Sequence, residues 1–406
     1  MKKVWDKWTR IALVKRILVG LILGAILGIA VPQATGIAIL GDVFVSALKA
    51  IAPLLVFFLV ISSLCNAGKS HGGVIKTVII LYMFSTVLAA VIAVFASMAF
   101  PVKMTLANAA TDTSAPQGIV EVLNNLLLNV VANPVSSLVN ANYVGILMWA
   151  VLLGLAFRAA DKMTKKVLAD VADGISMVVT WIINLAPFGI FGLVFNTVST
   201  NGLDIFTTYG KLLLLLVGCM LFIYFVTNPL LVYWCIRQNP YPLIFHCLKR
   251  SALTAFFTRS SAANIPVNMK VCEEMGLDRD TYSVTIPLGA TINMDGAAIT
   301  ITVMTMATAF TLGIHVDIPT AIILSLLAAL SACGASGVAG GSLLLIPMAC
   351  SLFGISDDIS MQVVAVGFII GVVQDSVETA LNSSSDLLLS ASAEFRQWRL
   401  EEIKFK

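Results

Sequence analysis

Four polar side chains recur along one apolar stretch near the carboxyl end of the chain. They are Asp375, Thr379, Asn382 and Asp386. Their spacing of four, three and four positions places them on one narrow face of an α-helix. A stripe of this kind offers oxygen atoms, which are the ligands that a hard cation such as Na⁺ requires. We therefore predict a cation site; the alternative is that the stripe only bonds neighbouring helices.

A second polar motif lies between Gly289 and Gly296, inside another apolar segment. It contains Asp295, and an aspartate in hydrocarbon costs about 3 kcal/mol or more, so this residue is expected to face a cavity, an ion or a partner. The two glycines would let the helix unwind and expose backbone carbonyls as further cation ligands.

A third group, Tyr82, Ser85 and Thr86, places hydroxyls on one face of an earlier apolar helix. The simplest interpretation is hydrogen bonding within that helix or to its neighbour.

Two apolar stretches are split by polar or glycine-rich centres, at residues 258–264 and 334–342. The arms on either side are too short to cross about 30 Å of hydrocarbon, so each stretch is predicted to be a re-entrant hairpin with its tip buried in protein or facing water. The tip residues either form sharp turns or present helix amino termini to a carboxylate. Arg259 in the first tip is expected either to bind an anion or to neutralise Asp375 or Glu378.

The composition sets the class of protein. Of 406 residues, 59% are hydrophobic and 12% are charged, against about 25% charged in soluble domains, which indicates a polytopic membrane protein. The net charge of +3 gives no reason to expect a nucleic-acid partner. Seven scattered cysteines and three distant histidines indicate neither a disulfide framework nor a catalytic metal. No organic cofactor is expected.

Clusters of Lys and Arg mark the cytoplasmic loops and both termini, which gives eight crossings and an all-α fold with two oppositely oriented re-entrant helical hairpins. Gly20, Gly24 and Gly28 are expected to allow close helix packing. A hairpin followed by a polar helix, repeated with opposite topology, is typical of secondary transporters.

Four motifs in order, Arg259-Ser260-Ser261, Asn293-Met294-Asp295-Gly296, the glycine-rich second tip and Asp375 through Asp386, resemble those of the dicarboxylate/amino acid:cation symporter family. This family includes glutamate transporters, and the chain is most similar to its bacterial sodium-coupled serine/threonine transporters. The resemblance implies a glutamate-transporter-like fold, a homotrimer and a place in the bacterial inner membrane. With it we divide the chain into a scaffold (1–240), a transport core (241–393) and a cytoplasmic tail (394–406). The third crossing, at about residues 74–100, is expected to contribute to an ion site although it belongs to the scaffold range.

The resemblance also implies site residues. Asp375 would accept the substrate amino group, and Asn382 with the first-tip serines would hold its carboxylate. The implied substrate site comprises Arg259, Ser260, Ser261, Val338, Asp375, Glu378, Thr379 and Asn382. The implied Na⁺ ligands are Tyr82, Ser85, Thr86, Gly289, Thr291, Asn293, Met294, Asp295, Asn382 and Asp386.

Two departures bear on the substrate. Carriers of glutamate and aspartate have an arginine where this chain has Glu378, and a threonine where it has Ala297. A carboxylate at 378 would repel an acidic side chain and could accept a hydrogen bond from a hydroxyl, so we expect Na⁺-coupled symport of L-serine and L-threonine. The alternatives are a carrier of another small neutral amino acid, a dicarboxylate carrier or an ion channel with re-entrant loops. An intramembrane enzyme would need a nucleophile and base, and none stands out.

Overall fold

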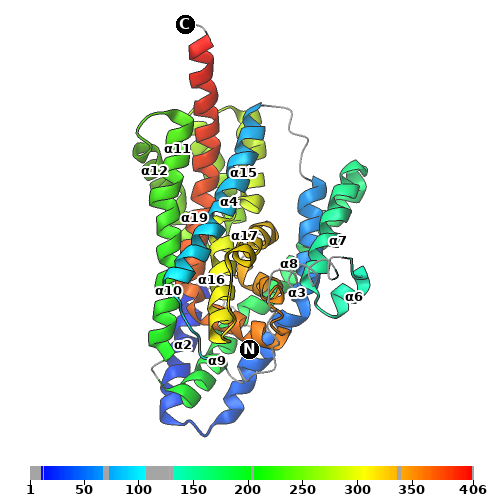
Figure 1. Cartoon of the computed structure of the whole chain (residues 1–406), viewed down its shortest axis with the longest axis vertical. Helices are drawn as coiled ribbons and strands as arrows, with labels where there is room; N and C mark the ends of the chain where they lie inside the picture. The colour runs from blue at the N-terminus through cyan, green and yellow to red at the C-terminus, as the bar shows by residue number, and fades with distance from the viewer. Residues whose placement is uncertain are drawn as a thin grey trace.

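The computed structural model describes residues 11, 13–66, 73–106, 128, 131–202, 205–335 and 340–404. All regular structure in those ranges is helical (Figure 1), which confirms the predicted all-α class. Six helices in the described ranges are long and apolar enough to cross a membrane. Together with the composition, they identify a multi-pass membrane protein.

One group of helices comes from the first half of the chain. It comprises α2 (Leu13–Ala30), η1 (Thr35–Ile37), α3 (Ala38–Asn66), α6 (Pro134–Val139), α7 (Tyr143–Ala156), η2 (Phe157–Ala159), α8 (Lys162–Asn184) and α9 (Ala186–Asn201). In this group α2 lies along α9, and α3 contacts α7, α8 and α9. Helices α8 and α9 meet at Leu185, and Pro187 lies in the first turn of α9, where proline is tolerated.

The glycine stripe of α2 lies against the backbone of α9. A Cβ at Gly24 would lie 2.6 Å from the carbonyl oxygen of Phe191, and one at Gly28 would lie 3.0 Å from that of Phe195. Since no side chain fits there, the stripe sets the close approach of the two helices, as predicted.

The second group surrounds the last helix. It comprises α4 (Gly73–Ala99), α10 (Ile205–Phe222), η3 (Ile223–Thr227), α11 (Asn228–Ile236), α12 (Tyr241–Cys247), η4 (Leu248–Ala252), α13 (Leu253–Thr258), α14 (Ser261–Glu274), α15 (Arg279–Ile292), α16 (Asp295–Thr311), α17 (Ile318–Ala332), η5 (Ser342–Leu345), α18 (Ile346–Ser351) and α19 (Asp357–Lys404). Here α19 contacts most other members of the group. Its 48 residues span about 72 Å, so it continues well beyond one membrane crossing.

Helices α4, α10 and α11 precede residue 240 but pack on helices from the second half of the chain. Both α4 and α10 contact α16 and α19, and α11 contacts α19. Val78, Leu81 and Tyr82 of α4 form a buried cluster with Cys235 of α11 and residues of α19. Helices from the first half of the chain therefore belong to the group that holds the polar stripe.

Local breaks occur where the sequence predicts them. Between α15 and α16 the backbone leaves the helix at Asn293 (φ −98°, ψ 79°) and Met294 (φ −120°, ψ 50°). The chain reverses between α13 and α14 at Arg259, which has a left-handed conformation (φ 53°). Asp317 caps α17, where the hydroxyl and backbone N–H of Thr320 donate to its carboxylate and lower its pKa.

The two groups are offset along the long axis of the molecule. At the end where α19 terminates, α4 extends beyond α3 and α7, whereas the turn between α2 and α3 forms the opposite end of the molecule (Figure 1). The groups touch through several pairs of elements, among them α9 with α19, α7 with α18, and α3 with η5 and α19.

We expect Gly24→Leu to lower the thermal stability of the protein in detergent, because the side chain would force α2 away from α9 at a cost of about 1–3 kcal/mol. Gly174→Leu on α8 is the control, since a Cβ there meets no atom within 4 Å. Equal melting temperatures for the two variants would contradict the packing role of the stripe.

Candidate functional site

The polar stripe of α19 faces the interior of the second group. Asp375, Glu378, Thr379, Asn382 and Asp386 are all buried. The stripe meets the break between α15 and α16, the first hairpin, η5 and α4, so it joins elements that are far apart in sequence.

Asp295 is the first residue of α16, and its carboxylate accepts hydrogen bonds from two hydroxyl groups of α4. Ser85 Oγ donates to Asp295 Oδ2 at 2.7 Å, and Thr86 Oγ1 donates to Oδ1 at 3.1 Å. The backbone N–H of Met294 donates to Thr86 Oγ1 at 3.2 Å. The side-chain oxygen of Asn293 is buried and has no hydrogen-bond partner among the described residues. A buried carboxylate with neutral donors and an unused amide oxygen beside it has the chemistry of a monovalent cation site.

A second cluster lies on the other side of Asn293. Asn293 Nδ2 donates to Asp386 Oδ1 at 2.9 Å and to the backbone carbonyl of Asn382 at 3.4 Å. A Cβ at position 289 would lie 2.8 Å from Asp386 Oδ1 and 2.9 Å from Tyr82 Oη. Glycine is therefore required at 289 for the carboxylate to approach the backbone of α15.

Tyr82 lies beside this cluster. Its hydroxyl bonds the carbonyl of Asp386 at 2.8 Å, the carbonyl of Thr285 at 3.3 Å and Ser390 Oγ at 2.7 Å. The structure thus brings together the hydroxyls of α4, the helix break and the carboxyl-terminal end of the stripe, at Asn382 and Asp386.

The family resemblance also implies a further Na⁺ site, formed by Thr291 with backbone carbonyls of the second tip, and the structure describes this region only in part. Thr291 Oγ1 donates to the carbonyl of Leu288 at 2.7 Å, within its own helix. Val338 and the rest of residues 336–339 lie outside the described residues.

Asp375 connects the two hairpins. Arg259 Nε donates to Asp375 Oδ2 at 2.6 Å, and the backbone N–H of Gly340 donates to Oδ1 at 3.1 Å. Of the alternatives for Arg259, the structure shows the pair with Asp375. In the same tip, Ser260 Oγ caps α14 by accepting from the N–H of Ala263, and Ser261 is buried.

Glu378 is held through one carboxylate oxygen. Its Oε2 accepts hydrogen bonds from Gln374 Nε2 at 2.5 Å, Thr300 Oγ1 at 2.7 Å and Ser342 Oγ at 2.9 Å. These three donors were not predicted. The position of Gln374 one turn before Glu378 was a possible signal, whereas Thr300 and Ser342 arrive from α16 and η5.

The remaining residues of the stripe bond locally or to the helix break. Asn382 Oδ1 accepts from the N–H of Gly296 at 2.7 Å, while Asn382 Nδ2 lies 3.5 Å from Met294 Sδ, a weak acceptor. Thr379 Oγ1 donates to the carbonyl of Asp375 at 2.8 Å. Among the hydrogen-bond donors of the stripe, the side-chain N–H₂ of Asn382 therefore has the weakest acceptor.

Two asparagines that sequence reasoning missed attach the first hairpin to α19. Asn264 Nδ2 donates to Ser383 Oγ at 2.8 Å, and Asn268 Nδ2 donates to the carbonyl of Ser383 at 2.8 Å. Their spacing of four residues on α14 was the available signal. These bonds fix the arm that follows Arg259.

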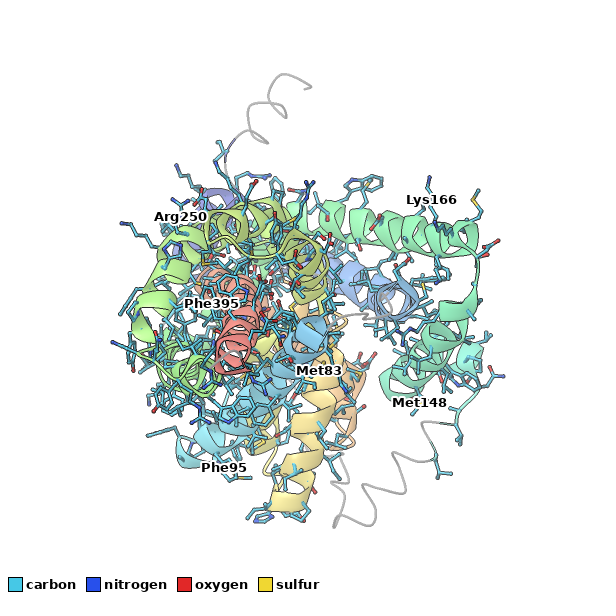
Figure 2. All side chains as sticks on the ribbon, turned by 90° about the horizontal axis from the view of Figure 1, so that it is seen from above. Met83, Phe95, Met148, Lys166, Arg250 and Phe395 are labelled. Atoms are coloured by element: carbon cyan, nitrogen blue, oxygen red, sulfur yellow. The ribbon has the colours of Figure 1, made fainter. Side chains whose placement is uncertain are left out.

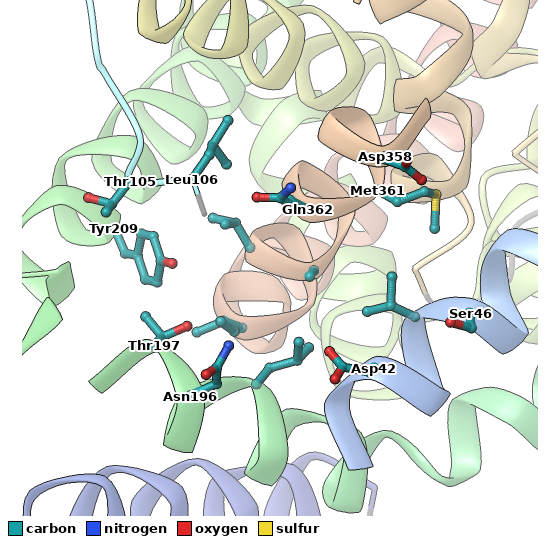
Figure 3. Close-up of a pocket in the computed structure, with 15 residues that line it drawn as sticks. Asp42, Ser46, Thr105, Leu106, Asn196, Thr197, Tyr209, Asp358, Met361 and Gln362 are labelled. Carbon is teal, nitrogen blue, oxygen red and sulfur yellow. The ribbon is translucent and has the colours of Figure 1, made fainter. Parts of the chain in front are cut away.

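A separate polar cavity of about 350 Å³ lies between the two groups of helices (Figure 3). None of the predicted site residues lines it. Its polar lining includes Asp42 and Ser46 of α3, Asn196 and Thr197 of α9, Tyr209 of α10, and Asp358 and Gln362 of α19.

The chain belongs to the sodium:dicarboxylate symporter family, whose model matches residues 13–394. This confirms the resemblance found in the motifs, and it identifies a transporter rather than an enzyme. Among curated relatives, the serine/threonine transporter SstT of Bifidobacterium adolescentis is 58% identical over 399 residues, which cover 98% of this chain and 93% of that protein. The serine/threonine transporter SstT of Streptococcus thermophilus (strain LMG 18311) is 55% identical over 400 residues, which cover 98% and 100% of the two chains.

We expect Thr86→Val to raise the Na⁺ concentration that half-protects the purified protein against thermal unfolding by about tenfold, because a hydrogen bond to a charged group is lost. Thr302→Val is the control, since its buried hydroxyl has no described partner. An unchanged Na⁺ dependence of Thr86→Val would remove α4 from the ion site.

Proposed function

We propose that this protein couples Na⁺ entry to the uptake of L-serine and L-threonine across the bacterial inner membrane by alternating access. The family description and the names of the two relatives support the class of substrate and ion. One observation carries the proposal for this chain. The helix break bonds the α19 stripe at two points, Asn293 to Asp386 and the N–H of Gly296 to Asn382, so ion ligands and substrate ligands share one rigid element.

Na⁺ ions would occupy the clusters on either side of Asn293. The deeper ion would use Asp295 with the hydroxyls of α4, and the other would use Asp386 with carbonyls near Gly289. Thr291 and Met294 would contribute to these or to a further site completed by the second tip. A Na⁺ near Asn293 would satisfy its unpartnered oxygen and compensate buried negative charge.

The substrate amino group would bind Asp375. Because Arg259 and Gly340 already donate to its two oxygens, an ammonium group must displace or share these donors. Binding therefore alters the contacts of both hairpins at once. The substrate carboxylate would accept from Asn382 Nδ2, whose present partner is a thioether, and from the serines of the first tip.

Glu378 would select against acidic substrates. Its three described partners are all neutral, so a second carboxylate nearby would meet uncompensated negative charge. A serine or threonine hydroxyl could donate to the carboxylate instead. Thr379 lies one residue further along the same face.

The second hairpin would act as the gate on the outer side. Gly340 contacts Asp375, and Ser342 contacts Glu378, so its closure depends on what the stripe holds. A carrier whose gate closes best with ions and substrate both bound does not leak either alone.

Alternating access would move the second group of helices against the first. We propose eight crossings and two re-entrant hairpins, cytoplasmic termini, and a homotrimer formed through the first group. The packing of α4, α10 and α11 on α16 and α19 supports including them in the moving part. The offset of the groups (Figure 1) and the polar cavity between them support a boundary at which the second group slides along the first. In this arrangement the second group would be displaced toward the cytoplasm.

The test is uptake of labelled L-serine into proteoliposomes. We expect accumulation only with an inward Na⁺ gradient, with competition by L-threonine and L-alanine and little by L-aspartate. Asp375→Asn should abolish uptake, since the carboxylate that binds the amino group is lost. Uptake that ignores Na⁺ would refute coupling, and a conductance without amino acid flux would indicate a channel.

We expect Glu378→Gln to strengthen inhibition of serine uptake by L-aspartate about tenfold, because a negative charge that repels the acidic side chain is removed. Glu273→Gln on the exposed surface of α14 is the control. If aspartate inhibits Glu378→Gln and the parent protein equally, Glu378 does not set substrate charge.

A further inference from the structure

A long groove runs between the last part of α4, from Ile92 onward, and the part of α10 from Lys211 to its end at Phe222. It has a volume of about 840 Å³ and lies outside the site described above. Phe95, which lines it, is at the periphery of the molecule, on the opposite side from Met148 of α7 (Figure 2). The groove is lined by α4, by the segment that directly follows it and by α10, so it belongs to the second group of helices.

The floor and walls of the groove differ in residue size. Ala96 and Ala99 of α4 and Gly218 of α10 keep the floor low, and a Cβ at Gly218 would meet no atom within 4 Å. Phe95 and Phe222, each about half exposed, line the groove as well. From Lys211 to Phe222 the lining of α10 extends about 16 Å. A hydrocarbon chain fits this shape and chemistry.

One charged side chain lines the groove, that of Lys211. It lies six residues inside α10, or about 9 Å along the helix. Neither α4 nor α10 contains an acidic residue, and among the residues that the structure describes the Lys211 side chain has no ion-pair or hydrogen-bond partner. Lysines within membrane helices usually pair with an anion or extend to the interface. Lys103 follows directly on the lining residue Val102 in the sequence.

We propose that this groove binds an anionic phospholipid, with the phosphate at Lys211 and an acyl chain along the floor of small residues. The length of the apolar lining matches an acyl chain. The unpaired charge of Lys211 favours a lipid whose headgroup carries a net negative charge. The bound lipid joins α4, which carries Tyr82, Ser85 and Thr86, to α10, which packs on α19. It therefore stabilises the group that contains the ion clusters.

The experiment measures lipid binding to the delipidated full-length protein by native mass spectrometry, with dioleoylphosphatidylglycerol and dioleoylphosphatidylcholine as probes. The parent protein should bind phosphatidylglycerol more tightly. Lys211→Gln should weaken phosphatidylglycerol binding about fivefold and leave phosphatidylcholine unchanged, because about 1 kcal/mol of headgroup attraction is lost. Lys76→Gln, at the other end of α4, is the charge control and should have no effect.

Gly218→Leu should weaken the binding of both lipids, because its side chain fills the floor. Gly210→Leu is the matched control on α10, since its Cβ is equally unobstructed and it does not line the groove. The proposal is overturned if the parent protein binds both lipids equally, if Lys211→Gln keeps its preference for phosphatidylglycerol, or if Gly218→Leu and Gly210→Leu behave alike.

Discussion

Burial of four carboxylates inside a membrane protein is the constraint on which the site depends. Asp375 has a cationic partner, Arg259. The described partners of Asp295, Glu378 and Asp386 are hydroxyls and amides. Neutral donors reduce the cost of a buried negative charge without cancelling it. The region around Asn293 consequently favours a cation, and charge balance links ion binding to the integrity of the fold.

The helix break and the continuous helix have complementary roles. Between α15 and α16, Asn293 and Met294 leave the helical conformation, so a backbone N–H and an amide side chain become available to α19. In contrast, α19 remains helical throughout and holds Asp375, Asn382 and Asp386 in fixed order. A rigid stripe that faces an irregular segment lets the proposed ion ligands and the proposed substrate ligands lie next to each other without sharing one carboxylate.

The grouping of the helices indicates which of them would move together with the polar stripe of α19. Ser85 and Thr86 bond Asp295, so α4 has to move with α16 if the ion site is to stay intact during transport. The packing of α10 and α11 on α19 extends the same body. From sequence, α4 was expected to contribute to an ion site through its hydroxyls, whereas the apolar spans of α10 and α11 carry no information about which neighbours they contact.

The sequence by itself determined the features that depend on local periodicity and composition: the all-helical membrane class, the stripe from Asp375 to Asp386, the break near Asn293 and the glycine contact surface of α2. Helical repeat and glycine geometry act over a few residues, so spacing alone reveals them. Only the tertiary structure decided the partners. Arg259 pairs with Asp375 rather than with Glu378, and Glu378 accepts hydrogen bonds from Thr300 and Ser342. These pairs are separated by tens to hundreds of residues, and which side chains meet depends on how each helix is rotated and inclined against its neighbour.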